Sequence, residues 1–173
     1  MLRALAIAAS LVFASGTALA QISGEAFSGF GGGSKSPVQI DADALEVVDG
    51  ENRAIFSGNV RVQQGDSVIE TSRLEVIYAK GGSNAEGGTP GNISKLNLSG
   101  GVIARSGANT AQGDKGSFDV IGEVVTLSGD VTLSQGKNVA KGCELVAQLK
   151  TNRAKLKRCP GQRVRTVITP GSN

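Results

Sequence analysis

A short motif recurs three times along the chain and constrains its fold more than any other feature. It reads apolar residue, Ser, Gly, any residue, Val, and it occupies residues 56–60 (FSGNV), 98–102 (LSGGV) and 127–131 (LSGDV). The glycines stand 42 and then 29 residues apart, and the surplus falls on residues 80–92 (KGGSNAEGGTPGN), which have the composition of an inserted flexible loop. Without that loop the period is near 29 residues. Such a repeat predicts stacked units that bury a shared apolar face.

Apolar and polar residues alternate in the segments that contain and separate these motifs. Residues 45–47 (LEV), 74–76 (LEV) and 118–120 (FDV) each place an acid between two apolar residues, and residues 125–133 alternate in the same way. A period of two indicates a strand with one buried and one wet face. The glycine of each Ser-Gly pair predicts a β-bulge or a close approach of two backbones. We therefore expect an all-β, antiparallel fold.

The N-terminus has the pattern of an export signal. Arg3 precedes an apolar run over residues 5–13, and residues 18–20 (ALA) form a small-residue cleavage site, so the mature chain is expected to begin at Gln21. The run is shorter than the roughly 18 to 20 residues of a membrane helix. The expected organisation is a signal peptide (1–20), a flexible Gly/Ser-rich segment (21–36), one β domain (37–160) carrying the 80–92 insertion, and a C-terminal tail (161–173).

The composition excludes several kinds of chemistry. The chain contains no histidine, which removes Ser-His and Cys-His nucleophilic pairs and imidazole metal ligands. Residues 113–116 (GDKG) resemble a calcium-binding glycine repeat only faintly, because further acids and repetition are missing. Carboxylate chemistry survives, and Asp41, Asp43 or Glu46 could supply it in a polysaccharide-active β-solenoid, although they suit the wet face of a strand equally well. We expect no metal and no cofactor.

Two cysteines, Cys143 and Cys159, are the only ones in the chain. In an exported protein an even pair suggests a disulfide, and two unpaired buried thiols are the alternative. A hairpin around Thr151 and Asn152 would place the cysteines nearly opposite each other, at the separation of cross-strand neighbours. We interpret the possible bridge as a structural link without a catalytic role.

The inward-pointing residues are the candidate binding surface. They are mostly Val, Leu, Ile and Ala, and such a sheet could pack on a second sheet as a sandwich or fold over and leave an apolar trough. The candidate lining residues are Val38, Ile40, Phe56, Val60, Val62, Leu74, Val76, Leu98, Val102, Phe118, Val120, Leu127, Val131 and Leu133.

Residues 40–74 resemble the OstA-like domain of the LptA family of periplasmic lipopolysaccharide transport proteins, and the resemblance extends over residues 38–149. The sequences that carry it are 43–47 (DALEV), 56–62 (FSGNVRV), 64–66 (QGD), 69–74 (IETSRL) and, as a second copy of the unit, 127–133 (LSGDVTL).

The resemblance implies a twisted antiparallel β-jellyroll that is V-shaped and open at its ends. It implies a non-enzymatic periplasmic protein whose inner face shields the acyl chains of lipid A. Copies would associate edge to edge, head to tail, and with an LptC-like inner-membrane-anchored protein and an LptD-like outer-membrane protein. A structural module that joins partners without holding lipid is the remaining alternative, beside the polysaccharide-active enzyme.

The C-terminal third departs from the rest of the chain in its charge. Nine of the eighteen Lys and Arg residues fall between Lys137 and Arg165, where Glu144 is the only acid. This run could meet the phosphates of lipid A or an acidic partner, or it could be a solvated edge that discourages aggregation. We do not expect nucleic acid as a partner, because Tyr78 is the only tyrosine and no aromatic residue is interleaved with the charges.

Overall fold

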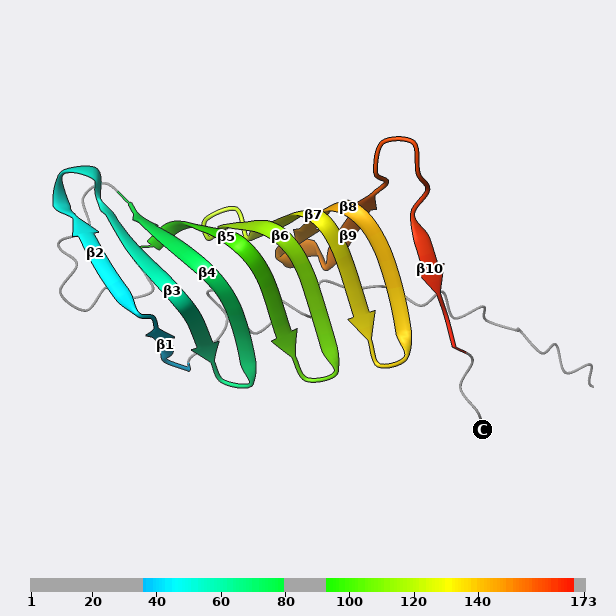
Figure 1. Ribbon diagram of the computed structural model, residues 1–173, viewed down its shortest axis with the longest axis horizontal. Helices are drawn as coiled ribbons and strands as arrows, with labels where there is room; N and C mark the ends of the chain where they lie inside the picture. The colour runs from blue at the N-terminus through cyan, green and yellow to red at the C-terminus, as the bar shows by residue number, and fades with distance from the viewer. Residues whose placement is uncertain (1–35, 80–92, 170–173) are drawn as a thin grey trace, which may run out of the picture.

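The computed structural model of the chain describes residues 36–79 and 93–169, which form one antiparallel sheet of ten strands (Figure 1). The expected signal peptide and the 80–92 insertion lie outside the described residues. The all-β expectation is confirmed, and the strand order β1-β3-β4-β5-β6-β7-β8-β10 does not close on itself.

Three hairpins of long strands make up the body of the sheet, one for each repeat of the sequence. Gly65, Gly107 and Gly136 each open the two-residue turn of a hairpin at φ of 57°, 55° and 56°, a conformation that costs glycine no steric strain. The strands are β3 (Arg53–Gln64) and β4 (Ser67–Tyr78), β5 (Ile93–Ser106) and β6 (Asn109–Asp119), and β7 (Val124–Gln135) and β8 (Asn138–Gln148).

Every long strand is divided by a break in register, and the breaks form a continuous line across the sheet. The pairing shifts between Ser57 and Val60 in β3, between Ser99 and Val102 in β5, and between Ser128 and Val131 in β7. These are the three recurring motifs, whose glycines at positions 58, 100 and 129 have φ of 76°, 81° and 101°. The predicted bulges are confirmed. We call this line the corner.

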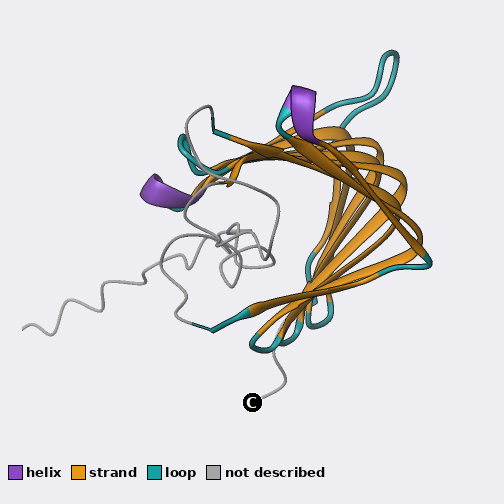
Figure 2. Cartoon of the chain, turned by 90° about the vertical axis from the view of Figure 1, so that its left-hand side faces the viewer, coloured by secondary structure: helices purple, strands orange, loops and turns teal. Residues whose placement is uncertain are grey.

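The corner divides the sheet into two arms. The upper arm comprises residues 53–57, 73–78, 93–99, 115–119, 124–128 and 144–148, and the lower arm comprises residues 60–64, 67–71, 102–106, 109–113, 131–135 and 138–142. In the view along the long axis, the sheet curls around an interior (Figure 2). A single sheet is thus folded over on itself, because glycine-containing bulges bend all of its long strands along one line.

Each edge of the sheet is a strand in two pieces, one on each arm. At the first edge, β1 (Val38–Asp41) pairs with the lower half of β3 and β2 (Ala44–Val48) with its upper half. At the last edge, β9 (Arg153–Lys157) pairs with the upper half of β8 and β10 (Arg165–Val167) with its lower half. The sheet therefore extends past residue 160, into the segment that the sequence assigned to a C-terminal tail. Short 3-10 turns, η2 (Asp49–Glu51) and η4 (Leu149–Thr151), complete the fold.

The hydrophobic core lies between the inner faces of the two arms. One continuous cluster of buried residues includes Val62 and Ile69 of the lower arm together with Leu74 and Val76 of the upper arm. Of the two arrangements left open by the sequence, the described residues show the sheet that folds over on itself, and they do not form a sandwich with a second sheet.

Candidate lipid-binding face

The structure places all fourteen candidate lining residues on the inner face. Val38, Ile40, Phe56 and Val120 are partly buried and pack against the core cluster, to which the other ten belong. Those ten side chains are between 1% and 8% exposed. The candidates thus form one apolar surface drawn from both arms, and their contact with lipid stays a prediction.

Small residues on the same face are not evident from the sequence pattern. They are nearly inaccessible, with exposed fractions of 0% to 2%. Alanine contributes little to an apolar pattern, so only the register reveals them: Ala104, for example, pairs with Ala111 and with Ile69. The alanines are Ala54, Ala104, Ala111, Ala140 and Ala147, and the larger missed core residues are Ile69, Val125 and Leu145.

The two arms line the interior with side chains of different size. The aromatic residues Phe56, Tyr78 and Phe118 all belong to the upper arm, where burial raises the pKa of the Tyr78 phenol. In the lower arm, three of the six positions in the cross-strand row that runs from Val62 to Ala140 are alanines. The upper arm therefore offers the bulky apolar surface, and the lower arm leaves the space for it.

Apolar surface reaches the solvent at the first edge. Leu45 and Val47 of β2 pair with the inward residues Phe56 and Ala54, yet 57% and 44% of their surface is exposed. The inner face thus continues beyond the closed part of the core.

A cavity of about 430 Å³ lies along the corner. Its lining includes Arg61 and Glu70, which lie on the outer face, together with Ser72, Gly100 and Gly101 of the bulges. It is therefore distinct from the apolar space between the arms. Between the arms, by contrast, the residues of the core cluster are 8% exposed or less.

Charged residues on the outer face of the first three long strands are paired across the sheet. Glu70 accepts hydrogen bonds from Arg105 and, at 2.9 Å, from Arg61. The bond from Arg105 is the main reason why the pKa of Glu70 is lowered. Asn97 and Arg53 donate to Glu75 at 2.9 Å each and lower its pKa in the same way.

At the first edge, Asp43 holds the corner. Its N–H donates to the Gly58 carbonyl and its carboxylate accepts from Asn59 Nδ2, both at 2.9 Å. A Cβ at position 58 would overlap this carboxylate, which explains the glycine. Asp43 is therefore a structural residue, while Asp41 accepts a bond from Gln39 at 3.1 Å. Within the described ranges, no three His, Cys, Asp or Glu side chains are grouped to hold a metal.

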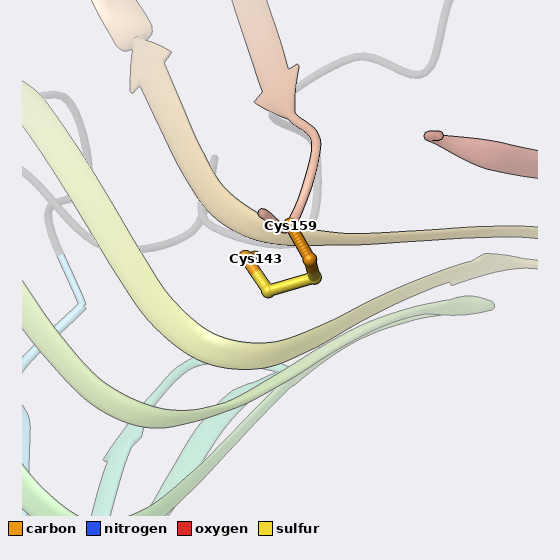
Figure 3. Close-up of a disulfide and its surroundings, with 2 residues drawn as sticks. All are labelled: Cys143 and Cys159. Carbon is orange, nitrogen blue, oxygen red and sulfur yellow. A yellow bond between two sulfur atoms is a disulfide. The ribbon is translucent and has the colours of Figure 1, made fainter. Parts of the chain in front are cut away.

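At the last edge, a disulfide holds the corner. Cys143, in the bulge of β8, is bonded to Cys159, which follows β9, and their Cα atoms are 4.9 Å apart (Figure 3). The hairpin that joins β8 to β9 pairs Gln148 with Arg153, as the sequence suggested. The bridge fixes the start of the segment that leads to β10.

The sequence and the fold were compared with known proteins. Residues 39–153 match the model of the family described as LptA/(LptD N-terminal domain) LPS transport protein. An uncharacterized protein of Rhizobium meliloti (strain 1021) is 38% identical over 173 residues, which cover 98% of this chain and 91% of that protein.

A solved structure shares the fold. It is the crystal structure of LptH, described as the LptA homologous periplasmic component of the conserved lipopolysaccharide transport device from Pseudomonas aeruginosa. The TM-score is 0.63 at 20% identity, over 78% of this chain and 96% of LptH. In residues 36–79 and 93–169 we find no helix with the length and apolar character needed to cross a membrane.

Proposed function

The chain belongs to the LptA/(LptD N-terminal domain) family of lipopolysaccharide transport proteins, and we propose that it carries lipopolysaccharide by shielding the lipid A acyl chains between its two arms. The family is one of transport proteins, so the chain is not an enzyme and the polysaccharide-active alternative is wrong. We place it in the periplasm, where it would bridge components of the inner and outer membranes.

The observation that carries this proposal is the single continuous apolar face. Inward residues from both arms and from every long strand meet in one cluster, and at the first edge Leu45 and Val47 extend that face into the solvent. Each acyl CH₂ group removed from water contributes about 0.8 kcal/mol. Several chains of a dozen carbons would therefore be held strongly, and leaving such chains in water would make the crossing of an aqueous compartment prohibitive.

Entry of the guest requires the arms to part. Residues such as Leu74 and Val131 are only 1% exposed, so acyl chains would replace contacts that these side chains now make within the core cluster. The exchange keeps apolar groups away from water, and its cost is therefore much smaller than that of exposing the core. The glycines of the corner supply the bend about which the arms would move.

The sheet edges are the proposed contacts with partners. Among the described strands, β2 pairs only with β3, and β9 only with β8, so each leaves one side of its backbone open for the addition of a further strand. We propose head-to-tail association of copies through these edges, and docking of LptC-like and LptD-like proteins to the same edges.

Lipid copurification tests the proposal most simply. The mature chain, purified from cells that make lipopolysaccharide, should release lipid A species that mass spectrometry identifies. A Leu45→Ser/Val47→Ser variant should bind purified lipopolysaccharide about tenfold more weakly, because two exposed aliphatic contacts are lost.

The matched control is Ala44→Ser/Glu46→Ser, which changes the alternate positions of the same strand and should leave lipopolysaccharide affinity within twofold. Absence of any lipid from the purified chain, together with equal affinities for the two variants, would favour the structural module that holds no lipid.

A further inference from the structure

Polar side chains line the hairpin end of the lower arm in one unbroken row. The register pairs Gln64 with Ser67, Ser67 with Ser106 and Ser106 with Asn109. It continues across the last hairpin, from Asn109 to Gln135 and from there to Asn138. We call these six residues the polar row.

The polar row faces inward. Each member lies two residues along its strand from a member of the apolar row of Val62, Ile69, Ala104, Ala111, Leu133 and Ala140, and side chains two residues apart share a face of the sheet. Gln64 and Ser67 are only 6% and 2% exposed. Six strands at about 4.8 Å spacing make the polar row about 24 Å long.

Hydrogen bonds hold the polar row in place. Ser67 Oγ donates to Ser106 Oγ at 2.9 Å, and Gln64 Nε2 donates to the Ser36 carbonyl at 3.1 Å. At the other end, Asn138 Oδ1 accepts from the Thr169 N–H at 3.0 Å. The groups are neutral amides and hydroxyls, each with the capacity for more than one bond. They suit hydroxyl and amide groups of a ligand.

Proximity to a turn does not explain the polar row. The connections at the opposite rim, on the upper arm, are flanked by Tyr78, Ile93, Val120 and Leu149, all of which pack against the apolar core. Both rims carry chain reversals, yet among residues 36–79 and 93–169 only the lower rim has a polar inner side. The interior therefore changes from apolar to polar across its width, as an amphiphile does.

We infer that the polar row is a subsite for the hydroxyl- and amide-bearing part of a sugar-headed lipid, so that the bound molecule lies with its chains against the upper arm and its head at the lower rim. This inference rests on the proposed function and adds the orientation of the lipid to it.

Two ligands, lipid A and pyrene, distinguish binding at the polar row from binding at the apolar face. The variant Ser67→Ala/Ser106→Ala removes both partners of one hydrogen bond and so leaves neither hydroxyl unpaired. Its affinity for lipid A should fall about tenfold, while its affinity for pyrene, a hydrocarbon without polar groups, should stay within twofold. Thr132→Ala/Ser134→Ala removes two hydroxyl groups from the outer face of the same arm and should change neither affinity.

Equal losses for lipid A and pyrene, or an unchanged affinity for lipid A, would overturn the inference and leave the proposed function standing. Failure of the unsubstituted chain to bind lipid A at all would overturn both.

Cross-linking tests the orientation of the bound lipid directly. A photoreactive residue in place of Gln135 should capture lipid A through its sugar, and fragmentation of the cross-linked peptide in a mass spectrometer should place the new bond on the sugar. For the same residue in place of Val120, the new bond should lie on a fatty acyl chain. Acyl adducts at both positions would refute the orientation.

Discussion

The first and last edges of the sheet meet the same geometric demand with different chemistry. At each edge a strand is broken where it passes the corner, with one piece on each arm. Asp43 secures the first edge through hydrogen bonds to Gly58 and Asn59, and the Cys143–Cys159 disulfide secures the last. The edge strands lie at opposite ends of the sheet (Figure 1).

The two edges also carry opposite charge. Residues 36–52 contain five acids and neither Lys nor Arg, whereas residues 137–165 contain nine Lys and Arg and the single acid Glu144. Lys157 is paired with Glu144 at 2.7 Å. One folded sheet thus presents ends of opposite charge, and copies that paired through these ends would add in one direction.

The largest expected effect is at the last edge. The cysteines are 16 residues apart, and closing a loop of this length stabilises a fold by roughly 3 kcal/mol. Cys143→Ala/Cys159→Ala should lower the free energy of unfolding by about that amount, measured by denaturant titration. The rate of amide hydrogen exchange should increase more in β9 and β10 than in β3 and β4. A uniform acceleration over the sheet would mean that the bridge does not act on this edge specifically.

Removal of the Asp43 carboxylate is expected to cost somewhat less. Asp43→Ala deletes the acceptor for Asn59 Nδ2, an exposed bond that joins two strands at the corner, and should lower the free energy of unfolding by about 1.5 kcal/mol. Asp41→Ala is the control and should change it by less than about 0.5 kcal/mol, because the partner of Asp41 is an exposed glutamine on the same strand. Equal effects of the two changes on the free energy of unfolding would show that Asp43 does not stabilise the corner.

Charge reversal tests whether the edges are complementary. Arg153→Glu/Lys155→Glu on β9 should weaken self-association about tenfold at low salt, because each exposed ion pair contributes up to about 1 kcal/mol. Analytical ultracentrifugation at increasing salt would measure it, and the parent chain should converge on the variant as salt screens the edges. Self-association that changes neither with salt nor with the charge-reversal variant would show that the charges of β9 do not guide assembly.

The smallest effect concerns acid sensitivity in the first half of the sheet. The pKa values of Glu70 and Glu75 are lowered in the folded chain by hydrogen bonds from Arg105 and Asn97. Their contribution to stability is therefore present above the ordinary glutamate value of 4.5 and is lost as the pH falls through the folded pKa values.

Thermal melts between pH 5 and pH 3 should show a fall of a few degrees that the Glu70→Gln/Glu75→Gln variant lacks. Both glutamates are partly exposed, so solvent screening keeps the effect small. An identical pH dependence in the variant would assign the acid sensitivity to other groups.

The strands, their faces and the positions of the bulges could be predicted from the sequence, because they follow from local patterns. Period-two alternation identifies which residues share a face, and the Ser-Gly motifs mark the bulges. The arrangement of the two arms is a long-range property. It depends on all the long strands bending along one line, and the pattern within any single strand does not specify that line.

The candidate site was predictable in part for the same reason. Residues such as Leu74 and Val102 stand out because large apolar side chains alternate with polar ones, whereas Ala104 and Ala111 gain their importance from the partners that the register gives them. The polar row could not be predicted from the sequence, since its members are separated along the chain and most are adjacent only across strands. Likewise, Asp43 resembles any wet-face carboxylate until the fold brings it under Gly58.

Site-specific photo-cross-linking at two adjacent positions of β6 tests the central claim most directly. Phe118 is 7% exposed on the inner face, and its neighbour Asp119 is exposed on the outer face. A photoreactive phenylalanine analogue at position 118 should capture lipopolysaccharide, and the same analogue at position 119 should not. Equal labelling from the two positions would contradict a lipid held between the arms.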